Sequence, residues 1–83
     1  MNAPEWLTRR QGAMKPGLNA ETLIVTMSGE PLYRLFATPA AGMFTCVVTQ
    51  TNNGRRLDGE KLYPSVEFAL AGGLDELRAR LGW

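Results

Sequence analysis

The pattern of apolar and β-branched residues predicts three strands in the first two thirds of the chain. Residues 22–27 are dominated by such side chains and end at a cluster of turn-forming residues, 28–31. Residues 32–38 lie between two prolines, at places where a missing backbone N–H need not interrupt a sheet. After a short loop, residues 43–51 form the third strand. We expect the first two strands to form a hairpin.

Side chains of two kinds alternate along the third strand and define its two faces. The face expected to point into the core carries Phe44, Cys46 and Val48. The other face mixes hydroxyl and apolar groups, namely Thr45, Val47, Thr49 and Thr51. Both sides of the second strand are rather apolar. Tyr33, Leu35 and Ala37 on one side compete for the core with Leu32 and Phe36 on the other, and the pattern leaves both arrangements open.

A further turn follows the third strand. Residues 52–54, Asn-Asn-Gly, tolerate positive φ and predict a tight hairpin turn. Residues 55–58 could return as a short fourth strand, and whether they do stays open.

The end of the chain predicts one amphipathic helix. Ser65 is suited to be its N-cap, and Glu67 lies in the first turn, where the helix dipole favours a negative charge. Apolar residues then recur at spacings of four, four, three and four, at Val66, Leu70, Leu74, Leu77 and Leu81. Gly82 fits a left-handed C-terminal cap.

The pair Gly72-Gly73 lies inside this helix, although each glycine there costs about 1 kcal/mol relative to alanine. Two explanations compete. The missing side chains let the helix approach the sheet or a second copy of the chain, or they provide a hinge or a backbone surface for a ligand. We favour close packing.

The first 20 residues contain Pro4, Gly12, Pro16 and Gly17 and predict an irregular N-terminal arm. Within it, residues 6–7, Trp-Leu, are expected to form a short helical turn docked on the body, or alternatively a linear motif for a partner. We therefore divide the chain into an arm, 1–20, and a single domain, 21–83.

These elements predict an α+β fold, with a three- to four-stranded antiparallel sheet followed by one C-terminal helix packed on one face. The order of elements resembles that of single-repeat modules of the Whirly and PUR single-strand-binding type, whose sheets also precede a helix. The resemblance is one of topology.

Composition limits what the chain can do. Its 83 residues suffice for one small domain, and 45% hydrophobic and 20% charged residues are typical of a folded protein. Cys46 is the only cysteine, so neither an internal disulfide nor a thiolate-rich metal cage is expected. The N-terminus lacks the pattern of a signal peptide, and no apolar run is long enough to span a membrane. We expect a cytoplasmic protein that does not bind membranes.

Residue types that carry catalysis are scarce. The sequence has no histidine, the usual general base and a common metal ligand. Ser28, Ser65 and Cys46 therefore lack the residue that would activate them as nucleophiles. The acidic residues do not have the spacing of a calcium loop or of paired glycosidase acids, and the glycines match no phosphate-binding fingerprint. We expect no enzyme, no cofactor and no metal.

Two kinds of binding remain. Because one helix can cover only one side of the sheet, the leading hypothesis is a non-enzymatic interaction module that forms a homo-oligomer, expected to be a homodimer, or binds a protein partner. The alternative is a module for single-stranded nucleic acid. Its contacts would be the basic residues Arg34, Arg55, Arg56 and Lys61 beside sheet aromatics such as Tyr33. A net charge of +1 makes this alternative the weaker one.

Overall fold

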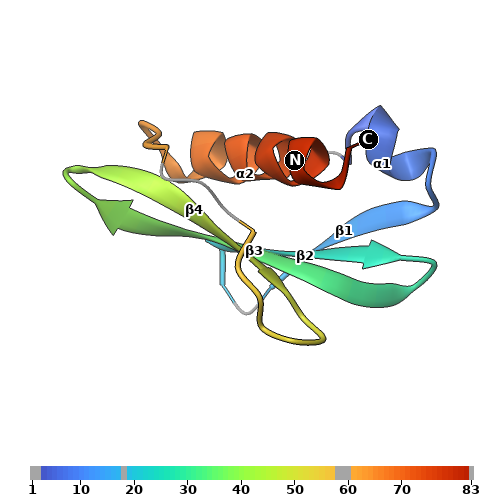
Figure 1. Ribbon diagram of the computed structural model, residues 1–83. Helices are drawn as coiled ribbons and strands as arrows, with labels where there is room; N and C mark the ends of the chain where they lie inside the picture. The colour runs from blue at the N-terminus through green and yellow to red at the C-terminus, as the bar shows by residue number, and fades with distance from the viewer. Residues whose placement is uncertain (1–2, 18, 58–60, 83) are drawn as a thin grey trace.

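A computed structural model describes residues 3–17, 19–57 and 61–82. Along the chain the elements are α1 (Glu5–Thr8), β1 (Gly12–Pro16), β2 (Thr22–Met27), β3 (Glu30–Ala40), β4 (Met43–Gln50) and α2 (Val66–Leu81). The four strands form one antiparallel sheet in the order β1-β2-β3-β4. Both helices lie on the same side of this sheet (Figure 1). The predicted α+β class, with a C-terminal helix on one face of the sheet, is confirmed.

The core lies between the sheet and α2. From the strands it takes mainly alternate residues, Val25, Tyr33, Leu35, Ala37, Cys46 and Val48, and from the helix it takes Ala69, Leu70, Leu74 and Leu77. The helix stripe predicted from the spacing of apolar residues is therefore the buried one. The core side of β3 carries Tyr33, Leu35 and Ala37. Phe36 therefore points to the other side of the sheet, where it is only half-buried.

Both ends of α2 follow from local sequence. The Ser65 hydroxyl accepts a hydrogen bond from the backbone N–H of Phe68, at 3.2 Å, as an N-cap does. At the other end Gly82 has φ 72°, in the left-handed region that favours glycine, and its N–H donates to carbonyl oxygens of the last turn. These predictions are confirmed.

The glycine pair in α2 marks the place where the helix lies closest to its neighbours. A Cβ on Gly73 would lie 2.9 Å from the Cβ of Cys46 and 3.2 Å from Leu35 Cδ2, and closer still to the Cys46 sulfur. A Cβ on Gly72 would collide with the ring of Tyr63. The structure therefore supports close packing rather than a hinge as the reason for both glycines.

The prediction of an irregular arm over residues 1–20 is wrong in part, because residues 12–16 form strand β1. The strand is held by pairing with β2, with Gly12 opposite Met27 and Pro16 opposite Leu23. The docked helical turn is confirmed as α1, whose Leu7 is fully buried. Gly12 allows this docking, since a Cβ there would lie 2.9 Å from the Leu7 carbonyl oxygen.

The strand boundaries differ from the predicted ones elsewhere. Strand β3 extends through both prolines, and Pro39 is tolerated because it lies beyond the last pair between β3 and β2, Thr22 with Phe36. Residues 55–57 form no strand but a single bridge, Arg56 with Thr49, and residue 58 lies outside the described residues. The fourth strand of the sheet is thus β1. Neither of the helices described is long and apolar enough to cross a membrane.

Candidate binding face of the sheet

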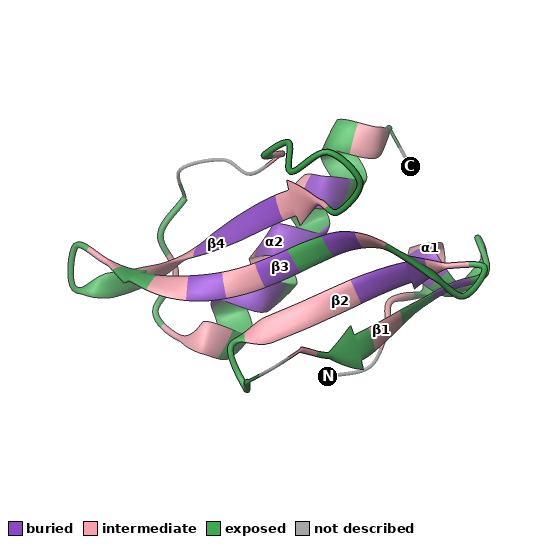
Figure 2. Ribbon diagram, turned by 90° about the horizontal axis from the view of Figure 1, so that it is seen from below, coloured by how far each residue is buried: buried purple, intermediate pink, exposed green. Residues whose placement is uncertain are grey.

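The side of the sheet opposite the helices is the open face. Figure 2 looks onto it from below, with α2 behind the strands. Because residues paired across antiparallel strands point to the same side, the register identifies its members. They are Ala13 and Lys15 from β1, Thr22, Ile24 and Thr26 from β2, Pro31, Arg34, Phe36, Thr38 and Ala40 from β3, and Met43, Thr45, Val47 and Thr49 from β4. Two of these side chains, Thr26 and Val47, are nonetheless buried, at 3% and 8% exposure.

One row of paired residues crosses the whole sheet and carries three cations. Lys15 pairs with Ile24, Ile24 with Arg34, Arg34 with Thr49, and Thr49 with Arg56. We call this set the basic row. Its three cationic residues are exposed. Since neighbouring strands lie about 4.8 Å apart, successive cations in the row are about 10 Å apart at the backbone.

The rows nearest the β3–β4 turn are apolar and hydroxyl-bearing instead. We call them the hairpin rows, and they consist of Thr22, Phe36, Thr38, Met43, Thr45 and Val47. Met43 in these rows is 37% exposed. Leu62 is 44% exposed and lies nearby, because it directly precedes Tyr63, which pairs with Phe44 of β4. The open face thus has an apolar half next to a basic half.

A shallow depression lies where the two halves meet. It has a volume of about 550 Å³, which is within the range of ligand pockets, and it is bounded by the turn after β1. On the sheet side it is lined by Ile24, Arg34 and Phe36. The Arg34 guanidinium lies over the Phe36 ring, 5.7 Å from its centroid, which is a cation–π contact.

Negative charge is placed elsewhere. By the strand register, no acidic residue within the described strands falls on the open face, because Glu30 pairs with Met27, which packs on the helix side. Glu67, Asp75 and Glu76 belong to α2, on the other side of the sheet, and Glu5 belongs to α1. Glu21 is exposed in the turn before β2 and directly precedes Thr22 of the open face. Asp58 and Glu60 lie outside the described residues. The described strand rows of the open face therefore carry positive charge, with one carboxylate in the turn beside them.

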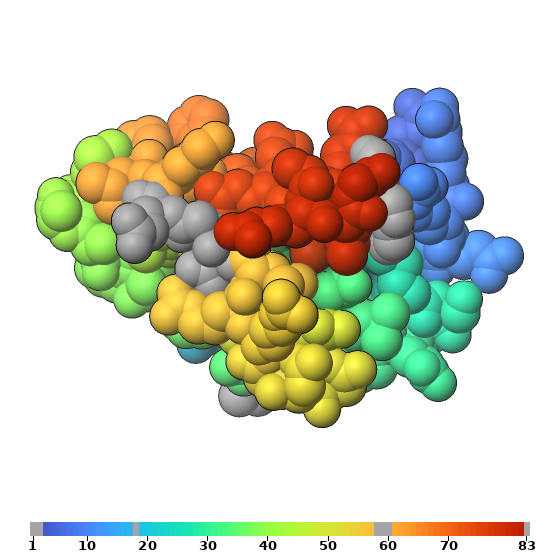
Figure 3. Space-filling view, in the orientation of Figure 1, coloured from blue at the N-terminus to red at the C-terminus, as the bar shows by residue number. Residues whose placement is uncertain are grey.

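Both edges of the sheet are protected. Beyond β4, Tyr63 exchanges two backbone hydrogen bonds with Phe44, at 2.7 and 2.9 Å, and Leu57 N–H donates to the Val48 carbonyl at 2.8 Å. Residues 51–57 lie along this side of the molecule, beneath α2 (Figure 3). At the opposite edge, β1 is only five residues long and ends at Pro16, which has no backbone N–H.

The structure brings some of the predicted contact residues together and separates others. Arg34 and Arg56 share the basic row, and Arg55 is the exposed neighbour of Arg56. Lys61 is exposed and follows residues 58–60, which lie outside the described part. Tyr33 does not belong to this surface, because it is only 7% exposed and packs in the core on the helix side.

Sequence reasoning missed Lys15. Its strand is so short that alternation is visible only between Met14, which is half-buried, and its exposed neighbours Ala13 and Lys15. A signal for this strand is that β2 lies inside the sheet and so has a second neighbour besides β3, which the preceding segment of the chain can provide.

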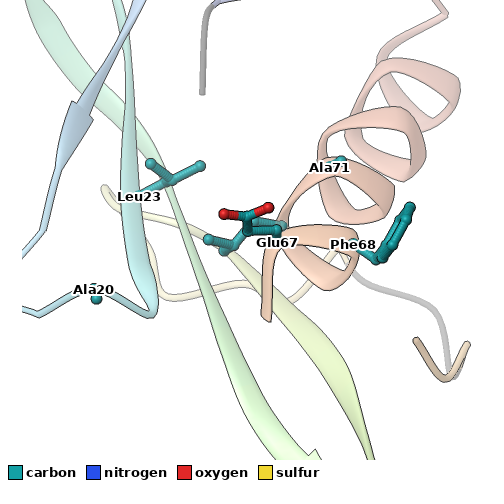
Figure 4. Close-up of a pocket in the computed structure, with 6 residues that line it drawn as sticks. Ala20, Leu23, Glu67, Phe68 and Ala71 are labelled. Atoms are coloured by element: carbon teal, nitrogen blue, oxygen red, sulfur yellow. The ribbon is translucent and has the colours of Figure 1, made fainter. Parts of the chain in front are cut away.

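A second hollow lies on the helix side, between α2 and β2. This groove of about 490 Å³ has Leu23 on the strand and Glu67 on the helix at its two sides (Figure 4). Phe68, which also lines it, is 63% exposed. Among the described residues no group of three or more histidine, cysteine or carboxylate side chains could hold a metal ion.

The serine and cysteine side chains considered as nucleophiles lie in the core, at a helix cap and in a turn. Cys46 is 2% exposed beneath α2, and the Ser65 hydroxyl caps the helix. Ser28 lies in the turn between β2 and β3, 3.4 Å from the Gln11 side chain. Burial and the nearby Glu76 carboxylate raise the pKa of the Tyr63 hydroxyl above its ordinary value of 10.0.

Comparisons with protein-family models, with curated proteins and with solved structures found no match to this chain, so its function has to be argued from its own residues.

Proposed function

We propose that this chain is a non-enzymatic interaction module that self-associates through the hairpin rows of its open face. The observation that carries the proposal is the one-sided covering of the sheet. The helices occupy one face, the β4 edge is bridged and the β1 edge is short, and the open face carries Phe36, Met43 and the largely buried Val47 in paired rows. A module of this kind fits a cytoplasmic setting, in which the buried thiol of Cys46 stays reduced.

The size of the domain favours association. A chain of 83 residues buries only about 60% of the surface that its unfolded form exposes, so its core alone gives modest stability. A partner that binds the folded chain but not the unfolded chain adds to that stability. Met43 and Leu62 are the apolar side chains that would gain most from being covered at this end of the open face.

The charges on the open face are compatible with a symmetric pair. In a two-fold arrangement centred on Thr45 and Val47, the apolar halves meet, and the two basic rows lie on opposite sides of the axis. Each basic row is two residues along the strand from the row of Phe36 and Val47, about 7 Å away. Arg34 of one copy therefore does not have to face Arg34 of the other.

Sedimentation equilibrium at about 50 µM tests the proposal, since association is concentration-dependent. We expect a mass above the 9.1 kDa of one chain. Thr45→Lys places a charge in the hairpin rows and is expected to shift the protein to the monomer. Ala79→Lys adds the same charge at an exposed position of α2 and is expected to leave the mass unchanged.

Two results would overturn the proposal. One is a wild-type protein that sediments as a monomer at this concentration. The other is an equal effect of the two lysine variants, which would place the contact away from the hairpin rows. Circular dichroism of each variant confirms that it is folded.

A further inference from the structure

The basic half of the open face suggests a second binding activity, whose site shares Thr22 and Phe36 with the hairpin rows. We infer that the basic row and the depression beside it bind single-stranded nucleic acid. The cations Lys15, Arg34 and Arg56 would contact phosphates, and bases would stack in the depression that Phe36 lines.

The charge distribution points to an anionic ligand. Three cations lie in one line across the sheet, and no acidic residue of the described strands shares their face. Their spacing of about 10 Å spreads the positive charge along a path instead of concentrating it at a point. A chain of phosphates fits such a path better than a single small anion does.

The contact between Arg34 and Phe36 favours a nucleic acid over an acidic peptide. Bases stack on aromatic rings and on arginine guanidinium planes, and here both surfaces line one depression of about 550 Å³. One recurring way to hold an extended peptide is pairing with a sheet edge. In this protein β4 is bridged by Arg56 and Tyr63, and β1 ends at Pro16.

The breadth of the site favours a single strand over a duplex. The major groove of DNA admits a helix or a two-stranded ribbon, and the basic row crosses all four strands. A single strand can lie across such a surface with its bases turned toward the protein.

Fluorescence anisotropy with a labelled twelve-nucleotide oligothymidine tests the inference. Three phosphate contacts on a single strand predict a slope of about −2 for the logarithm of affinity against the logarithm of salt concentration. Affinity should therefore fall about 20-fold between 50 and 200 mM salt. We expect saturable binding at 50 mM salt.

Variants then locate the site. Arg34→Ala and Lys15→Ala each remove one contact and should lower the affinity about eightfold at 50 mM salt, with a shallower salt slope. Arg80→Ala removes the same charge from an exposed position of α2 and should change the affinity less than twofold. Phe36→Leu keeps an apolar side chain but removes the ring, and should weaken binding at least about fivefold.

Several outcomes would overturn the inference: no saturable binding at 50 mM salt, an equal loss from Arg34→Ala and Arg80→Ala, or binding of a twelve-base-pair duplex or a polyglutamate peptide as tight as that of the single strand. The self-association of the hairpin rows is measured without nucleic acid, as a mass. Failure of one proposal therefore leaves the other standing.

Discussion

Replacing Gly73 by alanine sets two opposing effects against each other in the middle of α2. Alanine is the better helix former by about 1 kcal/mol, so in an open position the change would stabilise the protein. In this structure the new methyl group would overlap the Cys46 sulfur and lie 2.9 Å from the Cys46 Cβ. Cys46 belongs to β4, the last strand of the sheet, and its side chain is only 2% exposed between the sheet and α2, so it has little room to move away.

The magnitude follows from these two terms. Overfilling a packed core costs about 1–3 kcal/mol, which exceeds the gain in helix propensity. We expect Gly73→Ala to lower the free energy of unfolding by about 1 kcal/mol. For a domain of this size, that loss corresponds to a Tm lower by about 4–8 °C.

Urea unfolding followed by far-UV circular dichroism measures the effect. Ala71→Gly is the matched control, because Ala71 is exposed on the same helix and its replacement reports the propensity difference without a clash. We expect it to cost about 1 kcal/mol. In a Cys46→Ala background the sulfur is gone, and the penalty of Gly73→Ala should shrink, which a double-mutant cycle detects as coupling.

The reasoning would be refuted if Gly73→Ala raised the stability by the amount that Ala71→Gly lowers it. Position 73 would then be open, and the approach of α2 to β4 would be looser than the structure describes. Absence of coupling with Cys46→Ala would likewise contradict the assignment of the clash to that side chain.

Two further predictions concern buried side chains. Cys46, 2% exposed, should react with thiol reagents at least about 100-fold more slowly in the native protein than in urea, because access requires opening of the core. Labelling at the unfolded rate would show that this face of β4 is not buried. For Tyr63, the raised pKa in the folded state means that its contribution to stability is present below about pH 10 and is lost as pH rises through the folded pKa. Urea titrations between about pH 9 and 11 should show a steeper loss for the wild type than for Tyr63→Phe, and superimposable curves would contradict the shift.

Local signals explain what could be predicted from sequence. The helix ends depend on residues beside them, Ser65 and Gly82, whose capping roles follow from their own chemistry. The faces of β4 follow from strict alternation through Cys46. The glycine pair destabilises a helix, so its presence there indicates that another part of the protein occupies the space of the missing side chains. In the structure Tyr63 and Cys46 do so.

The parts that sequence did not predict depend on pairing between distant residues. Strand β1 has a glycine and a proline at its ends, and it exists because β2 offers it a partner. In β3, Tyr33 and Phe36 are both aromatic, and the register with β4 decides which is buried: Phe36 pairs with Val47 of the open face. The sequence pattern leaves both faces of β3 open as the core side, so it could not exclude Tyr33 from the candidate contact residues.

Net charge likewise leaves the placement of individual charges open. A total of +1 is the small difference between nine basic and eight acidic residues, and it contains no information about where they lie. The acidic residues of α2 are separated from the basic row by a core that is about 10 Å thick in packed layers of this kind. A ligand in contact with Arg34 lies at least that far from the helix carboxylates, so their repulsion is weaker than the attraction of the cations that the ligand touches. On the solvent side, salt screens the field of the basic row beyond about 10 Å at 0.1 M. A ligand would therefore gain little from long-range attraction, and its affinity would depend on how many phosphates the row contacts at once.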